Sequence, residues 1–385
     1  MKKLGLVVNP VAGVGGRVGL KGSDGPEVLR RARSLGALPR STGRAVQALE
    51  ALSRLRNRVR VLTYPGEMGE DEALECGFSP EVLGSIVRGE TTAGDTRAAA
   101  RAMEEQGVDL LLFAGGDGTA KDICDAVGRR VPALGIPAGV KMHSAVFALT
   151  PRHAGEAASM FLMGRLTRTR DSEVMDVDEE AFRRGVVDAT LRGYLRVPEQ
   201  RDMVQGAKAG SVPAEEDALR GIGAQVAATM EEGTAYVVGP GTTTGAVMDA
   251  LGLEGTLLGV DVVVDGRLEQ RDANEAHLLE LVRARPCKLV LGVIGGQGYV
   301  LGRGNQQISP EVLRDIGTEN VVVAATREKL LALEGRPLLV DTGDEELDRL
   351  LEGFTRVVTG VNEHHVYRVG GRAGPPATLD AGPAR

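Results

Sequence analysis

The chain has 385 residues, which is too long for one ordinary domain and predicts two. Hydrophobic residues make up 42% and charged residues 26%, so the composition excludes a chain that is disordered or collagen-like throughout. The formal net charge of -7 excludes an overall basic surface for nucleic acid or an anionic membrane. Glycine is unusually frequent, with 53 residues, and this excess indicates tight turns and phosphate-binding loops.

The cysteines and the apolar runs predict a cytoplasmic protein. Cys76, Cys124 and Cys287 are far apart and form no C-x-x-C pair, as is usual where thiols stay reduced. The first apolar run, residues 4–8, is shorter than the core of a signal peptide, which has about 7 to 15 residues. No window of about 18 apolar residues occurs, so we expect no membrane span.

The first part of the chain alternates strands with helices. Such alternation, with short glycine-rich turns, is typical of a parallel, doubly wound sheet. We therefore expect an α/β nucleotide-binding domain over residues 1–164, with Thr42 as the N-cap of its second helix. The predicted elements are strands at 4–8, 58–63 and 108–114, and helices at 27–35, 43–56, 95–106 and 120–127.

The pattern changes near Arg165. Residues 173–178 and 186–197 are typical of short alternating strands, and β/α alternation resumes near Gly233, with strands at 257–264 and 289–294. These features predict a second, mixed β-rich and α/β domain over residues 165–370. The last residues, 371–385, are rich in Gly, Pro and Ala and predict a disordered tail.

The first glycine-rich loop follows the first strand. No Gly-Lys pair occurs in the chain, which excludes a Walker A motif, and the run 13–18 ends on valine, where the dinucleotide fingerprint needs Gly or Ala. The loop still offers backbone N–H groups beside a helix start, so an anion site and a plain connector both remain open. Its candidate ligand residues are Asn9, Gly13, Gly15 and Gly16.

Gly-Gly-Asp-Gly-Thr at 115–119 is the most specific motif. It lies at the carboxyl end of a predicted parallel strand, where open α/β sheets bind ligands. Asp117 is its candidate catalytic residue, because a carboxylate between glycines can accept a proton from a hydroxyl while neighbouring N–H groups bind phosphate. The alternative is that Asp117 only caps a helix that begins near Thr119.

Other polar residues follow predicted strands or precede helices, and each has a structural alternative. Thr91 and Thr92 are ligand contacts or helix caps, and Lys141, His143 and Ser144 are ligand contacts or capping and solvated groups. Arg303 between two glycines is a phosphate ligand or a surface ion pair. The remaining candidates for phosphate contact are Gly239, Gly241, Thr242, Thr243 and Asn305.

Two further clusters are interpreted as structural. His364 and His365 are neighbours on a predicted strand, so they point to opposite faces and are expected on an edge strand; we predict no protein metal cluster. The acidic run that contains Asp341, Asp344 and Asp348 is expected to form a solvated acidic face near a helix start.

The motif at 115–119 resembles the signature of the NAD kinase, diacylglycerol kinase and phosphofructokinase-like superfamily. Taken with other segments, the chain from Lys3 to Val369 is similar to the ATP-NAD kinase branch that includes the acetoin-catabolism X proteins. The segments that carry this resemblance are residues 9–13, 64–69, 91–96, 141–144, 239–243 and 302–310.

The resemblance implies ATP-dependent phosphorylation of the adenosine ribose 2′-hydroxyl of NAD, usually with Mg²⁺. Asp117 would orient and deprotonate that hydroxyl, and Gly115, Gly116, Gly118 and Thr119 would line the phosphates. The Asn-Glu pair of better-known NAD kinases would correspond to Asn274-Glu275 or to Asn362-Glu363. Residues 139–144 depart from the Asn-rich segment of those enzymes.

We therefore expect a cytoplasmic kinase for NADP biosynthesis, with ATP or polyphosphate as the phosphoryl donor. The alternatives are a nucleotide sensor without catalysis and a kinase for another ribose, sugar or lipid hydroxyl. The expected partners are small-molecule nucleotides within a homo-oligomer, without nucleic acid or membrane. The sequence does not determine the phosphoryl donor, whether the acceptor is NAD or NADH, or the number of subunits in the oligomer. We also expect the glycine loops of the two domains to face a common cleft.

Overall fold

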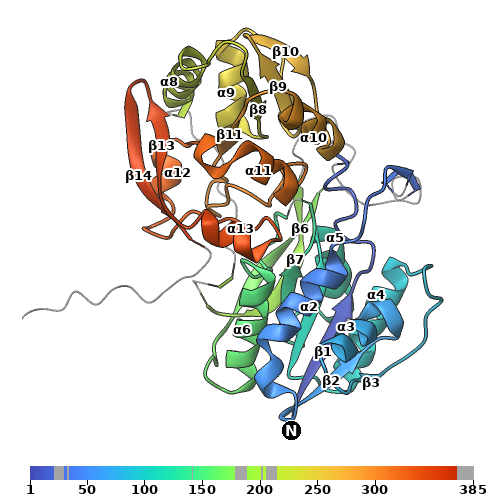
Figure 1. Ribbon diagram of the computed structural model, residues 1–385. Helices are drawn as coiled ribbons and strands as arrows, with labels where there is room; N and C mark the ends of the chain where they lie inside the picture. Colours follow the sequence, from blue (N-terminus) through green and yellow to red (C-terminus); the bar gives the residue numbers. More distant parts are fainter. Residues whose placement is uncertain are drawn as a thin grey trace, which may run out of the picture.

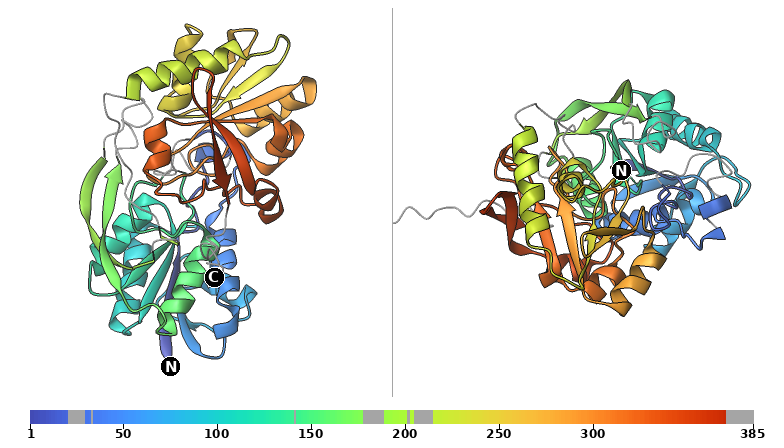
Figure 2. Two further views of the ribbon diagram at one scale, coloured as in Figure 1. Left: turned by 90° about the vertical axis from the view of Figure 1, so that its left-hand side faces the viewer. Right: turned by 90° about the horizontal axis from the view of Figure 1, so that it is seen from above.

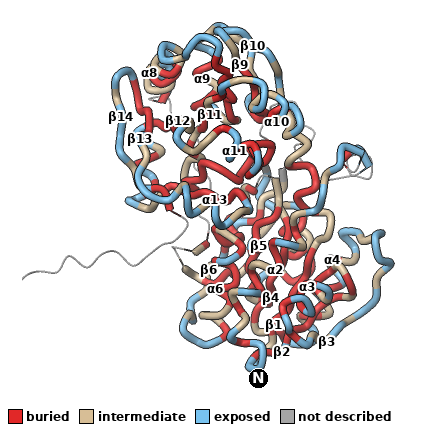
Figure 3. The backbone as a smooth tube through the Cα atoms, in the orientation of Figure 1, coloured by how far each residue is buried: buried red, intermediate tan, exposed pale blue. Residues whose placement is uncertain are grey.

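The computed structural model has two α/β domains, one above the other in Figure 1. It describes residues 1–20, 30–32, 34–140, 142–177, 189–200, 203–204 and 215–370. Buried backbone runs through the centre of each domain and exposed backbone surrounds it, as Figure 3 shows. The predicted tail at 371–385 lies outside the described residues, as do residues 27–29 and 33 of the predicted helix at 27–35. The described residues 30–32 and 34 of that segment are helical.

The N-terminal domain is built on a five-stranded, fully parallel sheet in the order β3-β2-β1-β4-β5. The order reverses between β1 and β4, because the chain first adds strands on one side of β1 and then on the other. All residues of β4 are buried, which explains why its sequence is continuously apolar. The strands are β1 (Lys2–Val8), β2 (Val59–Thr63), β3 (Glu81–Val82), β4 (Leu110–Gly115) and β5 (Ala133–Pro137).

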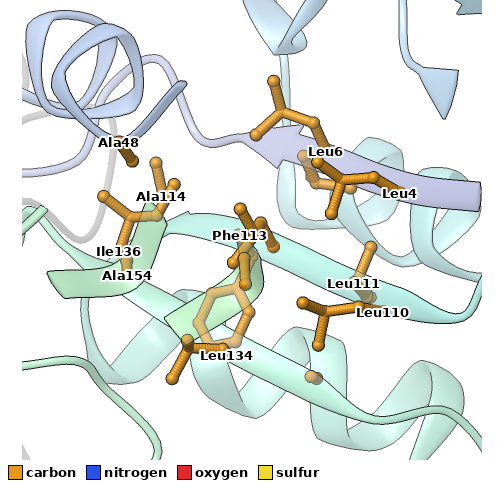
Figure 4. Close-up of a cluster of buried hydrophobic side chains, with 14 of the residues drawn as sticks. Leu4, Leu6, Ala48, Leu110, Leu111, Phe113, Ala114, Leu134, Ile136 and Ala154 are labelled. Carbon is orange, nitrogen blue, oxygen red and sulfur yellow. The ribbon is translucent and has the colours of Figure 1, made fainter. Parts of the chain in front are cut away.

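Helices cover both faces of this sheet. Leucines of β1 and β4 form the core with small residues such as Ala48 and Ala154 from two packed helices (Figure 4). A Cβ on Gly155 would lie only 2.1 Å from the carbonyl oxygen of Ala48, so a glycine is needed where those helices cross. The helices are α2 (Ser41–Ala51), α3 (Glu70–Glu75), α4 (Ala93–Glu105), α5 (Asp117–Val127), α6 (Pro151–Leu162) and the short 3₁₀ turns η1 (Ser53–Leu55) and η2 (Gly66–Met68).

The antiparallel hairpin of β6 (Thr169–Val177) and β7 (Ala189–Pro198) belongs to the first core. Val174, Leu195 and Val197 are buried there, and the hairpin runs along the side of the N-terminal domain (Figure 2). The predicted strands are therefore present, and their buried side chains pack against the core of the N-terminal domain.

The C-terminal domain has a mixed seven-stranded sheet in the order β10-β9-β8-β11-β12-β13-β14. β8, β11, β12 and β13 are parallel, and the other three strands are antiparallel to their neighbours. The structure thus confirms the expected fold class. The strands are β8 (Ala235–Val238), β9 (Asp261–Val264), β10 (Arg267–Gln270), β11 (Cys287–Gly292), β12 (Val321–Ala324), β13 (Gly353–Gly360) and β14 (Glu363–Val369). His364 and His365 lie on β14, an edge strand of the sheet, as expected.

Helices also cover both faces of the second sheet. α8 and α9 bury their apolar residues on one face, whereas α10 and α11 bury theirs on the other. The helices are α8 (Glu215–Ala228), α9 (Thr242–Ala250), α10 (Glu275–Ala284), α11 (Pro310–Ile316), α12 (Arg327–Leu331), α13 (Glu345–Leu350) and the 3₁₀ turn η3 (Thr318–Asn320).

The loops at the carboxyl ends of both sheets meet between the domains. The N–H of Gly304, in the loop after β11, donates to the carbonyl of Val140, in the loop after β5, at 3.0 Å. The amide of Gln306 donates to the same carbonyl at 2.8 Å. Leu149 from the N-terminal domain packs with Tyr299 and Leu339 in a small apolar cluster. The carboxyl edges of both sheets therefore lie toward the domain interface.

Candidate functional site

The reversal of strand order between β1 and β4 places two sequence motifs side by side. Asn9 follows β1, and its side-chain amide donates to the hydroxyl of Thr119 at 2.9 Å. The amide oxygen of Asn9 also accepts the N–H of Val11 at 3.2 Å. Asn9 thus fixes the first glycine loop against the motif after β4. The site lies where open α/β sheets usually bind ligands.

Asp117 is the first residue of α5, and Gly116 is the N-cap. Its carboxylate does not cap its own helix, so the capping alternative is wrong. Instead Oδ2 accepts the N–H of His143 at 2.7 Å and Oδ1 accepts the N–H of Ser144 at 3.0 Å. The helix begins at Asp117 rather than near Ala120. The carboxylate is therefore held from outside its helix, with its side chain 10% exposed.

The glycines of this motif are required by close backbone packing. A Cβ on Gly115 would lie 2.3 Å from the hydroxyl of Thr119. A Cβ on Gly139, in the loop after β5, would lie 2.7 Å from the Cα of Gly116. The loops after β4 and β5 therefore touch through their backbones, and this contact brings residues 143 and 144 onto Asp117. Gly118 is exposed.

The segment after β5 supplies the second half of the site. The His143 ring places Nδ1 3.4 Å from Asp117 Oδ2, and its side chain is 10% exposed. Ser144 is fully buried, and its hydroxyl accepts the N–H of Met175 at 3.0 Å, which fixes the segment to β6. Lys141, the third residue predicted here, lies outside the described residues.

The first glycine loop lies between the two domains, and residues 12–16 are buried. Gly13 has a φ of 79°, and a Cβ there would lie 2.2 Å from the carbonyl of Ala138. A Cβ on Gly16 would lie 3.1 Å from the Cβ of Gln306, a residue of the C-terminal domain. Gly15 is buried in the same loop. The loop is therefore a packed connector as well as a candidate anion site.

Asn274-Glu275 lies against this loop. The N–H of Glu275 donates to the carbonyl of Arg17 at 3.1 Å, and its carboxylate lies 3.5 Å from the Arg17 guanidinium. The Asn274 side chain caps α10 by accepting the N–H of His277 at 3.0 Å. Asn362-Glu363 lies at the turn between β13 and β14, where the N–H of Asn362 donates to Gln225 of α8. Of the two candidate pairs, the first is adjacent to a predicted nucleotide loop.

The loop after β8 begins α9 at the strand-order reversal of the second sheet. Gly241 is the N-cap with a φ of 125°, and Thr242 is exposed. Thr243 is buried, and its hydroxyl accepts the Lys329 ammonium at 2.7 Å. Lys329, which also lies 3.7 Å from Glu215, had no signal in the sequence because only the fold brings α12 to this loop. Gly239 donates its N–H to Val290 within the sheet.

Thr91 and Thr92 precede α4, and Thr92 is its N-cap. The Thr92 hydroxyl accepts the N–H of Gly94 at 3.2 Å, and Asp95 accepts the N–H of Thr92 at 2.8 Å, which completes a capping box. The capping role of Thr92 is thereby confirmed. At α2, in contrast, the N-cap is Arg40, and the expectation for Thr42 is wrong because the helix already begins at Ser41.

Arg303 is 5% exposed and lies between the domains. Its guanidinium donates to the carbonyl of Leu149 at 3.0 Å, lies 3.6 Å from Asp341 and stacks 4.7 Å from the ring centroid of Tyr299. A Cβ on Gly302 would lie 1.9 Å from the carbonyl of Asp341, so this glycine serves backbone packing rather than an open approach to a ligand. The alternative of a surface ion pair is wrong, because the pair with Asp341 is buried, and the phosphate contact stays a prediction.

Asn305 uses both ends of its side chain within its own loop. It accepts the N–H of Gly302 at 2.9 Å and donates to the carbonyl of Val300 at 2.8 Å. These bonds hold the turn that carries Arg303.

Asp341 is the centre of a buried ionic cluster. Both of its oxygens accept Nη1 of Arg44, a residue of α2, at 2.6 Å. Burial alone would raise the pKa of Asp341, but the charges of Arg44 and Arg303 outweigh it and hold the pKa below its ordinary value. Burial and the charge of Arg44 lower the pKa of nearby Arg40 to about 9. The expectation of a solvated acidic face is therefore wrong for Asp341, which is 4% exposed.

The carboxyl edges of the two sheets, where open α/β sheets bind ligands, meet between the domains. Two family models match the chain: the ATP-NAD kinase N-terminal domain over residues 4–166 and the ATP-NAD kinase C-terminal domain over residues 231–369. The chain belongs to the ATP-NAD kinase family, and these domains support a kinase that phosphorylates NAD. A search of curated proteins found no match, and neither did a search of solved structures. No helix in the described part of the chain is both long and apolar enough to cross a membrane.

Proposed function

We propose that this protein transfers a phosphoryl group from ATP to the 2′-hydroxyl of the adenosine ribose of NAD and so forms NADP. The observation that carries the proposal is the placement of Asp117. Its carboxylate lies at the strand-order reversal of the first sheet and is oriented by the N–H groups of His143 and Ser144. It lies there in a chain of the ATP-NAD kinase family.

Asp117 acts on the acceptor hydroxyl. Each carboxylate oxygen can accept about two hydrogen bonds, so one bond from the backbone leaves each of them able to accept another. The ribose hydroxyl donates to this carboxylate, which takes its proton as the new O–P bond forms and the donor P–O bond breaks. Phosphoryl transfer asks the protein mainly for positioning and charge stabilisation, and the two backbone bonds position Asp117 for this step.

The phosphates bind along the facing loops. The start of α5, with Gly116 and Gly118, presents backbone N–H groups and the positive end of the helix dipole. Across the interface, the exposed Thr242 and its neighbour Gly241 present the start of α9. An acceptor on one edge and a donor on the other would meet between the domains.

The residues present fit the Mg²⁺ that this family implies. Within the described ranges, no group of three His, Cys, Asp or Glu side chains could hold a metal by itself. Mg²⁺ usually takes one or two carboxylates and completes its shell with substrate phosphates and water. Asp117 and the hydroxyl of Thr119 are the oxygen donors that would hold it. When bound, Mg²⁺ neutralises phosphate charge.

The test is Asp117→Asn in a coupled assay for NADP, with NAD and NADH as acceptors and ATP and tripolyphosphate as donors. We expect kcat to fall by about 10² to 10⁴ because the proton acceptor is lost, with little change in NAD binding. Asp71→Asn, at an exposed carboxylate paired with Arg88, is the matched control and should keep full activity.

Two results would contradict this proposal. If the wild-type protein binds nucleotide but transfers no phosphoryl group from any donor, it is a sensor. If Asp117→Asn keeps its kcat, Asp117 is not the residue that accepts the proton.

A further inference from the structure

We propose that Arg40 and the first turn of α2 form a binding site for a phosphate group of a nucleotide. The inference rests on the proposed function for the identity of that nucleotide, which is ATP or NAD. The proposed function places phosphates at the starts of α5 and α9. The additional site lies beside the first glycine loop, at the start of a third helix.

Arg40 lies against the first glycine loop. The backbone N–H of Arg40 donates to the carbonyl of Ala12 at 3.5 Å. A Cβ on Gly13 would lie 3.4 Å from the Cβ of Arg40 and 2.2 Å from the carbonyl oxygen of Ala138. The N–H of Ala138 in turn donates to the carbonyl of Gly115 at 3.0 Å. Two packed loops therefore connect Arg40 to the loop after β4.

The first turn of α2 offers backbone N–H groups to a ligand. The helix has 11 residues, its N-cap Arg40 makes no side-chain cap, and no acidic residue lies in its first turn. Among the described residues, none accepts the N–H of Ser41, Thr42 or Gly43, and Gly43 is exposed. The carboxyl of Glu72 approaches Thr42, but burial raises its pKa to about 7, so near neutral pH it supplies only part of a negative charge. The positive end of this helix therefore favours an anion.

The Ser41 side chain is an independent indication of a ligand. Ser41 is 0% exposed, and its hydroxyl has no hydrogen-bond partner among the described groups. Because the Cα–Cβ bonds of a helix tilt toward its N-terminus, this side chain points to the end that carries the free N–H groups. Buried hydroxyls usually have a partner, and a phosphate oxygen at the start of α2 would provide one.

The charge balance around Arg40 also favours an anion. Three guanidinium groups interact electrostatically with the carboxylate of Asp341, and they belong to Arg40, Arg44 and Arg303. With Asp348, which interacts with Arg44, these described groups carry three positive charges and at most two negative ones. Burial and the charge of Arg44 lower the pKa of Arg40, as expected for a cation with too little negative charge nearby. A bound phosphate would balance this excess.

The Arg40 guanidinium has donors left for a ligand. Its Nη2 donates to the carbonyl of Thr342 at 3.1 Å, which is the one hydrogen bond of this guanidinium to a described group. A Cβ on Gly343 would lie 2.5 Å from the same nitrogen, so the backbone covers one side of the guanidinium. A guanidinium has five N–H donors and can bind two oxygens of one phosphate. Arg44, in contrast, is buried and uses Nη1 on both oxygens of Asp341.

The site joins the two domains, because Arg40 precedes α2 and its guanidinium contacts residues 342–343 of the C-terminal domain. A phosphate bound here would neutralise positive charge at that contact. The guanidinium, the backbone N–H groups and the serine hydroxyl are all donors, and together they match the several oxygens of a phosphate.

The binding test is Arg40→Gln, measured by isothermal titration calorimetry. ATP, NAD, tripolyphosphate and inorganic phosphate are titrated separately, so no transfer to an acceptor occurs. We expect at least one nucleotide to bind about 10- to 100-fold more weakly, because charged hydrogen bonds are lost. Arg54→Gln, at an exposed arginine just beyond the end of α2, is the matched control and should bind all four probes like wild type.

The probes identify which nucleotide supplies the phosphate. Weaker binding of ATP and tripolyphosphate, with NAD binding unchanged, would assign the site to the phosphoryl donor. Weaker binding of NAD alone would assign it to the pyrophosphate of the acceptor. Both results support the site.

Ser41→Ala tests the same site without changing its charge. It removes one hydroxyl and should weaken binding of the same probe by about 3- to 10-fold. Ser53→Ala, at the other end of α2, is its control. Without ligand, Arg40→Gln and Ser41→Ala should keep or raise the Tm, because one removes a like charge and the other an unpaired buried hydroxyl. Both should lose part of the rise in Tm that the affected probe gives to the wild type.

Unchanged binding of all four probes to both variants would overturn the site, and a lowered Tm with unchanged binding would show that Arg40 is only structural. If Arg40→Gln does not fold, Ser41→Ala decides. A wild-type protein that forms no NADP, combined with weaker probe binding in Arg40→Gln, overturns only the proposed function. Normal NADP formation with normal probe binding in both variants overturns only the phosphate site.

Discussion

Two carboxylates lie near the domain interface in very different surroundings. Asp341 faces the guanidinium groups of Arg44 and Arg303 and is 4% exposed. Asp117 faces two backbone N–H groups and the His143 ring, and its side chain is 10% exposed. A carboxylate with two buried cationic partners joins elements together, whereas one held by neutral N–H groups can still accept a substrate hydroxyl.

The largest effect is expected from a substitution that disrupts the buried cluster around Asp341. Arg44→Met leaves Asp341 buried with less compensation, so the free energy of unfolding should fall by about 3 to 5 kcal/mol, measured by urea denaturation. The additional change Asp341→Leu should recover part of this loss. Arg129→Met, at an exposed pair with Asp171, is the control and should cost no more than about 1 kcal/mol. A similar small loss for Arg44→Met would show that the buried pair does not tie the domains.

A third carboxylate, Glu72 of α3, differs from both because no cationic group lowers its pKa. Glu72 is buried, with 1% of the residue exposed. Burial raises its pKa to about 7. The folded protein therefore binds this proton more tightly than the unfolded chain. Its contribution to stability is fully present below about pH 4.5 and is lost as pH rises through about 7.

Glu72→Gln should accordingly raise the free energy of unfolding at pH 8, by up to about 3 kcal/mol, and change it little at pH 4.5. Thermal unfolding at both pH values measures the difference. Glu75→Gln, at an exposed residue of the same helix, is the control. A gain of equal size at both pH values would exclude titration of Glu72 as the cause.

Arg303→Lys tests whether Arg303 stabilises the fold through its ion pair with Asp341 or binds a phosphate of the ligand. Lysine keeps the charge but loses the planar contact with Tyr299 and the forked donors, so we expect a loss of about 1 to 2 kcal/mol in stability. The KM for both nucleotides should stay within about twofold of wild type. A raised KM with unchanged stability would instead support the phosphate contact that the sequence suggested.

The smallest expected effect concerns Thr92. Thr92→Ala removes the α4 cap and should cost about 1 kcal/mol in thermal or urea unfolding, without a change in NADP formation. Thr91→Ala is the stability control, since Thr91 is not the cap residue. A kinetic defect in Thr92→Ala with normal stability would show a ligand contact.

The sequence by itself determined the fold class and the position of Asp117 at the edge of the first sheet. Short apolar runs followed by glycine turns and alternating with helices predict a parallel α/β sheet, because strands buried on both faces have this pattern. The motif at 115–119 follows such a strand, so Asp117 had to lie at the carboxyl edge of the sheet. Both features depend on residues that are close together in the chain, so a single sequence is enough to recognise them.

Tertiary structure alone decided what each polar group faces. Arg44 and Asp341 lie 297 positions apart, and no spacing in the chain predicts their contact. The same holds for Lys329 and Thr243, and for the buried environment of Arg303. Whether a carboxylate is a solvated surface group, a structural ion or a proton acceptor depends on the charges and the solvent that folding places around it, and these come from segments distant in the chain.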